Sequence, residues 1–232
     1  MMIPKRVKAL LAVAIAVLTM PVAWPNSTPF PGSLAAMAIA LTCEALLGLL
    51  LGSIILLAIT SMELAGQAIG HLAGIDMAEA IDANAEETTS ILSSLLGWFA
   101  VALLLTMGGH RQLMDCSLQS FERYPAGNVR PESFWLTELD DMLRHALVIG
   151  VRAAAPVGTA LLMANLITGL LARTLPQLNV LAIGFNINVS AMFVAMIMSI
   201  GGVAWVFQSE LSVWIQSCQA IVEPSSIRQV NR

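Results

Sequence analysis

The sequence predicts an all-α integral membrane protein, and two observations point to this class: its composition and the form of its apolar stretches. Of the 232 residues, 57% are hydrophobic and only 11% are charged, whereas ordinary soluble domains carry about 25% charged residues. A soluble domain of this size would need more polar surface. The apolar stretches are continuous and do not alternate with polar residues, which favours helices over a membrane β-barrel. We therefore expect one helical domain, residues 1–232.

Five stretches approach the length of about 20 apolar residues that a membrane-spanning helix needs. The first resembles a signal peptide, but Met20–Trp24 is a poor cleavage site because small residues are scarce there. A break rich in Pro, residues 25–32, follows it. Two later linkers are longer and charged, residues 63–90 and 110–145. The predicted apolar helices cover residues 7–24, 34–62, 91–109, 146–172 and 183–207.

The basic residues do not orient these helices. If all five cross the membrane, the two sides carry similar numbers of Lys and Arg, so the positive-inside rule gives no decision. One explanation is ordinary noise in this count. Another is that some of the helices are not simple spans but hairpins buried against other subunits, and both explanations stay open. The net charge of −4 offers no basic surface for nucleic acid. One side would carry Lys5, Arg6, Lys8 and Arg173, and the other Arg111, Arg123, Arg130, Arg144, Arg228 and Arg232.

Glycines recur every four residues in two places. Positions four apart share one face of a helix, and glycine there lets a neighbouring backbone approach closely. Glu44 lies on the first of these faces, where a carboxylate is costly and usually meets protein or water instead of lipid. Packing within this chain and packing against other subunits are both open. The two sets are Gly48 with Gly52, and Gly66 with Gly70 and Gly74.

Polar residues also occur in the later apolar stretches. Arg152 and Asn165 flank Pro156 in the fourth stretch, and Glu210 follows the fifth. Proline removes a backbone hydrogen bond, so we expect Pro156 to kink or interrupt its helix. A secondary transporter could use such residues for ions or protons, whereas a structural assembly would use them as hydrogen bonds between helices. The second role is the more frequent one.

Nothing in the sequence predicts an enzyme, a metal site or a cofactor. The three cysteines lie far apart without C-x-x-C spacing, so we expect isolated core thiols and neither a disulfide framework nor a zinc site. The three histidines have no ligand partner at i+3 or i+4. No catalytic or phosphate-binding motif is present. The cysteines are Cys43, Cys116 and Cys218, and the histidines are His71, His110 and His145.

The stretch from Gly74 to Asn84 mixes Ile and Met with carboxylates. Its apolar side chains need burial, and Met adapts well to irregular or changing contacts. A surface loop is the alternative interpretation.

In family order, the motifs of this chain resemble the FliR family of export-gate proteins over residues 3–205. The last block is the most specific. The motifs are Ile3-Pro4-Lys5-Arg6-Val7-Lys8 up to Met20-Pro21; Glu44-x3-Gly48-x3-Gly52; Ala65-Gly66-Gln67-x-Ile69-Gly70; Gly74-x-x-Met77-Ala78; Gly108-Gly109-His110; Ser120-Phe121-x-x-Tyr124-Pro125-x-Gly127; and finally Ala155-Pro156, Asn165-Leu166, Gly169-Leu170, Arg173, Pro176-Gln177-Leu178-Asn179-Val180 and Ile183-Gly184-Phe185.

The resemblance implies a non-enzymatic subunit of an export gate in the bacterial inner membrane, at the flagellar basal body or the base of a secretion system. Such subunits form a cone of helical hairpins with FliP-type and FliQ-type subunits around the pore for unfolded export substrates, and an FlhB-type subunit is a further expected partner. A loop plugs the closed pore, here about Gly74 to Thr89. The implied plug residues are Gly74, Ile75, Asp76, Met77, Ile81 and Asp82, and the implied intersubunit residues are Glu44, Gly48, Gly52, Gly66 and Gly70.

The chain departs from the family pattern at Ala83, Leu181 and Asn186. The first apolar helix of the family is also missing, so we expect upstream coding sequence for about 30 more residues, roughly one span. The block from Pro176 to Phe185 favours a flagellar over an injectisome member. The rival of another class is a small secondary transporter, although no second matching half is visible.

Overall fold

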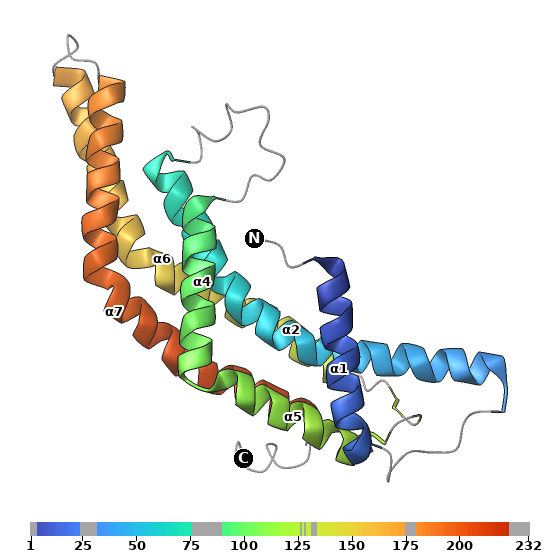
Figure 1. The fold of residues 1–232 in the computed structure, drawn as a ribbon. Coiled ribbons are helices and arrows are strands. Elements are labelled where there is room, and N and C mark those ends of the chain that lie inside the picture. Colours follow the sequence, from blue (N-terminus) through green and yellow to red (C-terminus); the bar gives the residue numbers. More distant parts are fainter. Residues whose placement is uncertain are drawn as a thin grey trace. The chain divides into compact units, whose positions relative to one another are not determined.

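The computed structural model describes residues 4–23, 32–75, 90–125, 127, 129–130, 134–174 and 180–222. These residues form helices and no strand (Figure 1), which confirms the predicted all-α class. The helices are α1 (Lys5–Ala23), α2 (Leu34–Ala73), α4 (Ile91–Thr106), α5 (Gly109–Arg123), α6 (Phe134–Thr174) and α7 (Val180–Val222).

Three of the described helices are long and apolar enough to cross a membrane: α2, α6 and α7. A fourth candidate span exists if α4 and α5 are counted as one broken span. At 1.5 Å per residue, a helix of 40 residues is about 60 Å long, roughly twice the hydrocarbon core of a bilayer. Each of these three helices is therefore longer than a single crossing perpendicular to the membrane requires.

The second apolar helix is longer than predicted. It was expected to end at Met62, before the polar residues Glu63 and Gln67, but α2 continues to Ala73. Buried side chains keep the spacing of one helix face through the extension, so packing outweighs the two polar residues. These side chains are Ala58, Met62, Ala65, Ile69 and Ala73.

The last two helices also exceed their predicted bounds. Glu138, Asp140 and Asp141 were placed in a linker, yet they lie within α6, which begins at Phe134 and continues without interruption past Pro156. Similarly, α7 continues beyond Phe207 through Ser209 and Ser212. The hydroxyl groups of these serines donate to the carbonyl oxygens three residues earlier, at 2.9 and 2.8 Å. Their polar atoms are thus satisfied within the helix.

A break at Met107 and Gly108 separates α4 from α5. Gly108 has a φ of +70°, a conformation that favours glycine and commonly ends a helix. The predicted helix over residues 91–109 therefore ends early, and the predicted linker contains α5. This helix is amphipathic and buries Leu113, Cys116 and Ser120 at helical spacing.

The described helices belong to two compact units. One unit comprises residues 1–54, 110–139 and 215–232, and the other comprises residues 55–109 and 140–214. We describe each unit by itself.

In the first unit, α5 is held to the end of α7. A disulfide joins Cys116 to Cys218, whose Cα atoms are 6.4 Å apart, within the usual range for such a bridge. Nearby, the Tyr124 hydroxyl donates to the carbonyl oxygen of Ile221 at 3.3 Å, and the Tyr124 ring meets Trp135 edge to face. The expectation of three isolated thiols is therefore wrong for two of them, while Cys43 is buried and free.

In the second unit, four helical segments share one apolar core. In α2, α4 and α6 the buried residues recur at intervals of three or four, as expected for helices packed along one face. The α2 segment buries Ala58, Met62, Ala65, Ile69 and Ala73. The others bury Leu92, Leu96, Ala100 and Leu104 from α4; Met142, Ala146, Ile149, Ala153, Val157 and Leu161 from α6; and Met192, Val203, Phe207, Leu211 and Trp214 from α7.

Candidate functional site

The two glycine faces of α2 have different surroundings. A Cβ atom added at Gly66 would lie 2.5 Å from the Leu92 carbonyl oxygen and from the Ser93 Cα atom. Gly66 therefore packs against the start of α4 within this chain. Gly70, one turn further on, is also buried. Close approach of two backbones explains glycine at position 66 without another subunit.

Gly48 and Gly52 lie on a face that this chain leaves open. Both are exposed, and among the described residues a Cβ atom added at either would meet nothing within 4 Å. Glu44, half-buried one turn earlier, accepts a hydrogen bond from the backbone N–H of Gly127 at 2.5 Å. The Glu44 carboxylate thus has a partner in its own chain, and the two glycines are available to a neighbour.

The predicted plug begins at the end of α2. Gly74 has a φ of +77°, its N–H donates to the His71 carbonyl, and the Ile75 N–H donates to the Gly70 carbonyl. This pair of bonds is the Schellman arrangement that closes many helices. Gly74 is therefore required by the helix end. The other predicted plug residues, Asp76, Met77, Ile81 and Asp82, lie outside the described residues.

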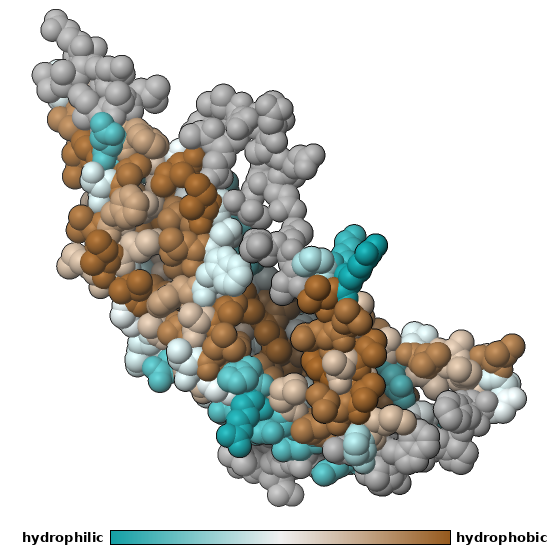
Figure 2. All heavy atoms as spheres, viewed as in Figure 1, coloured by the Kyte–Doolittle hydropathy of each residue, from teal (hydrophilic) through white to brown (hydrophobic). Residues whose placement is uncertain are grey.

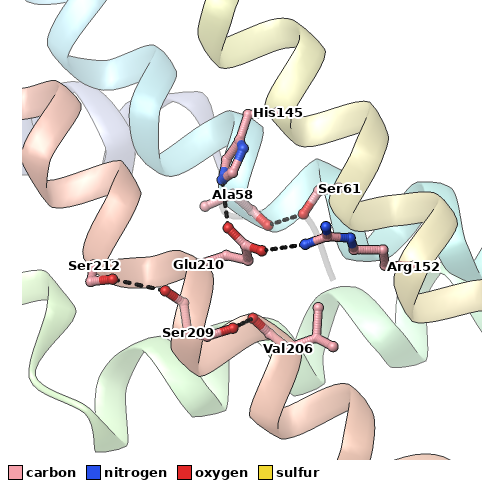
Figure 3. A network of polar contacts seen from close by, with 8 residues as sticks. All are labelled: Ala58, Ser61, His145, Arg152, Val206, Ser209, Glu210 and Ser212. Carbon is pink, nitrogen blue, oxygen red and sulfur yellow. Dashed lines mark hydrogen bonds and ion pairs between the residues drawn. The ribbon is translucent and has the colours of Figure 1, made fainter. Parts of the chain in front are cut away.

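A buried carboxylate connects α6 and α7 in the second unit (Figure 3). One oxygen of Glu210 accepts a hydrogen bond from the Arg152 guanidinium at 2.9 Å. The other oxygen lies 2.8 Å from Nε2 of His145, an ion pair when the imidazole is protonated and not a well-aligned hydrogen bond. The His145 ring also meets Trp214 edge to face. Glu210 thus lies between the guanidinium of Arg152 and the imidazole of His145, both on α6.

Asn165 makes the second set of polar contacts in this unit. Its side-chain amide donates to the Leu72 carbonyl of α2 at 3.2 Å. Its side-chain oxygen accepts a hydrogen bond from Asn188 of α7 at 2.6 Å. Gly184 lies nearby, because a Cβ atom there would contact Thr168 at 3.6 Å. Asn165 therefore links three helices at the end of the α6–α7 pair.

Arg152 and Asn165, which suggested a polar site of a secondary transporter, are not brought together. Arg152 binds Glu210, whereas Asn165 binds Leu72 and Asn188, so the two residues that suggested such a site have separate partners inside the chain. Of the remaining motif residues, Arg173 and Phe185 are exposed. Pro176 and Gln177 lie outside the described residues.

Sequence reasoning missed the link between His145 and Glu210. The spacing of residues along one helix indicates only local partners for a histidine, whereas this contact joins residues that are 65 positions apart (210 − 145). The available signal was a carboxylate, an arginine and a histidine within predominantly apolar helices. Within the described part of the chain, no three His, Cys, Asp or Glu side chains are grouped to hold a metal ion.

Long apolar helices joined by internal polar contacts define a helical membrane protein without a catalytic constellation among the described residues. Residues 1–213 match the family described as "Bacterial export proteins, family 1". The chain belongs to this family of non-enzymatic export-apparatus proteins, which confirms the resemblance to the FliR family.

Individual proteins that are similar in sequence to this chain point to the same family. The flagellar biosynthetic protein FliR of Caulobacter vibrioides is 24% identical over 205 residues, which are 88% of this chain and 82% of the relative. FliR of Escherichia coli K12 is 30% identical over 188 residues, 81% of this chain and 71% of the relative. The surface presentation of antigens protein SpaR of Salmonella typhimurium is 29% identical over 147 residues, which are 62% of this chain and 54% of the relative.

Proposed function

We propose that this chain is a core subunit of a type III protein export gate in the bacterial inner membrane. It assembles with FliP-type and FliQ-type subunits, and with an FlhB-type subunit, around the pore that unfolded export substrates cross. The match of residues 1–213 to a bacterial export family carries this proposal. The flagellar system is favoured over an injectisome, because the match covers 71% of the Escherichia coli FliR but only 54% of SpaR.

The surface of the chain is consistent with a subunit of a larger membrane assembly. Figure 2 shows hydrophobic side chains covering much of the visible surface, over α1 and over the α6–α7 pair. On α1 almost every side chain is exposed, and on α7 Ile197, Met198 and Trp205 are at least 69% exposed. Apolar surface of this extent needs lipid or protein against it.

The open face of α2 provides the first test. Replacing Gly48 by leucine should reduce the recovery of FliP-type and FliQ-type subunits with the tagged chain by about tenfold or more, since the new side chain would separate two closely packed helices. The measurement is co-purification from membranes that contain all three proteins. Because no described atom lies within 4 Å of a Cβ atom at Gly48, we expect the variant itself to fold normally.

The matched control is Leu49→Ala on the same helix, which shortens an exposed apolar side chain next to the glycine. It should retain most of the partner recovery. Equal recovery with wild type and Gly48→Leu would mean that this face does not pack against a partner.

The proposed plug, from Gly74 to about Thr89, provides the second test. Ile75, Met77 and Ile81 would fill an apolar constriction, and each could contribute about 1.5–3 kcal/mol when fully buried. Deleting residues 75–84 should therefore leave the complex assembled but allow small ions to leak. The measurement is ion conductance of liposomes that carry the assembled gate.

The control for this test keeps the loop length and its three apolar residues while replacing Asp76 and Asp82 by asparagine. That gate should stay tight. A deletion variant that assembles and conducts no more than wild type would show that the loop is not the seal.

A further inference from the structure

α2 carries two carboxylates, Glu44 and Glu63, within 40 residues. Glu44 has the Gly127 N–H as its partner in the first unit. Glu63 lies in the second unit and is half-buried. Among the residues that the structure describes, Glu63 has neither a hydrogen-bond donor nor a basic side chain as a partner.

The helices of the second unit leave space for this carboxylate. A Cβ atom added at Gly97 of α4 would lie 2.8 Å from Cγ and from Oε1 of Glu63. A side chain at position 97 would therefore require the Glu63 side chain to move. The glycine permits the carboxylate to lie against α4.

Glu63 also lines a groove of about 340 Å³ between α2 and α6. The α2 wall includes polar side chains, and the α6 wall is apolar. The groove is thus largely apolar, and Glu63 is the acidic residue in its lining. Its lining includes Leu57, Thr60, Glu63 and Gln67 from α2, and Leu143 and Leu147 from α6.

An ionised carboxylate in largely apolar surroundings is costly unless a cation or several hydrogen-bond donors face it. The same unit follows this rule at Glu210, which faces both Arg152 and His145. Outside the described residues, the chain has only Arg228 and Arg232 as further basic side chains. A cation for Glu63 would therefore have to come from outside the described residues of this unit.

We propose that the groove between α2 and α6 receives a helix of a partner subunit that places a Lys or Arg side chain against Glu63. The apolar walls suit the body of a membrane helix, and the carboxylate selects for a basic side chain at one position. This inference rests on the proposed function, because it requires a gate built from several subunits.

The test uses the tagged chain co-purified from membranes with FliP-type and FliQ-type subunits. Glu63→Gln keeps the side-chain volume but loses the charge, and should reduce partner recovery by about thirtyfold or more, the scale of losing one partner of a buried charge pair. Glu63→Lys should reduce it further. Glu122→Gln, at an exposed carboxylate of α5, is the control and should behave as wild type.

A photo-reactive residue at Gln67 identifies the occupant of the groove independently of variant folding. The expected product is a cross-link to a partner segment that contains a Lys or Arg. Replacing that basic residue by Glu should then restore the recovery lost in Glu63→Lys.

Three outcomes would overturn the inference. One is wild-type recovery of partners by both Glu63 variants, and another is a cross-link from position 67 to residues 223–232 of the same chain. The third is a cross-link to lipid alone. If the unchanged chain retrieves no FliP-type or FliQ-type subunit, the proposed function fails first and this inference fails with it.

Discussion

Replacing Gly66 by alanine should lower the free energy of unfolding of the unit formed by residues 55–109 and 140–214 by about 1–3 kcal/mol or more. The added methyl group would lie 2.5 Å from backbone atoms of Leu92 and Ser93. Backbone atoms cannot move aside as the end of a flexible side chain can, so α2 and α4 would have to separate. The measurement is denaturant unfolding of the purified chain in detergent micelles, followed by helical circular dichroism.

Gly52→Ala is the matched control on the same helix. A Cβ atom there would meet nothing within 4 Å in the part of the chain that the structure describes, and alanine is a better helix former than glycine by about 1 kcal/mol. The control should therefore be neutral or slightly stabilising in the isolated chain. Equal unfolding free energies for the two variants would contradict the packing described for Gly66.

Replacing Glu210 by alanine should also have a large effect on the same unit. It would leave Arg152 and His145 of α6 without their carboxylate, and removing one partner of a buried charge pair typically costs about 3–5 kcal/mol. We expect the lower end of this range, because the Arg152 side chain is 61% exposed and water can solvate part of it. The same unfolding measurement applies.

Two further variants show whether the effect comes from the buried cluster. Glu210→Gln retains an acceptor for Arg152 and should lose less stability than the alanine variant. Asp140→Asn removes an exposed ion pair with Arg144 and should change the unfolding free energy by less than about 0.5 kcal/mol. If Asp140→Asn lowered the free energy of unfolding as much as Glu210→Ala, the contacts of Glu210 with Arg152 and His145 would have no special role in stability.

The fold class and the positions of the apolar helices could be predicted from the sequence, because both follow from local composition. The first predicted helix, residues 7–24, agrees closely with α1 at Lys5–Ala23. Helix ends were less predictable. Glu63 and Ser209 resemble breaks in hydropathy, but neither changes the backbone preference enough to end a helix whose next turns remain packed.

Contacts between distant segments could not be derived from spacing alone. The disulfide between Cys116 and Cys218 spans 102 residues. Gly66 and Gly48 have the same four-residue pattern in the sequence, yet only Gly66 has another helix of the chain against it. A small-residue pattern indicates that a neighbour can approach, but it does not identify which neighbour does so.

Export from living cells tests the central claim most directly. The measurement compares the amount of a flagellar export substrate outside cells that lack this chain, with and without a plasmid that encodes it. The account predicts that export stops without the chain and returns with it, while general secretion by other routes is unchanged. Normal export from cells that lack the chain, in the absence of a second homologous gene, would contradict its role as a core subunit of the gate.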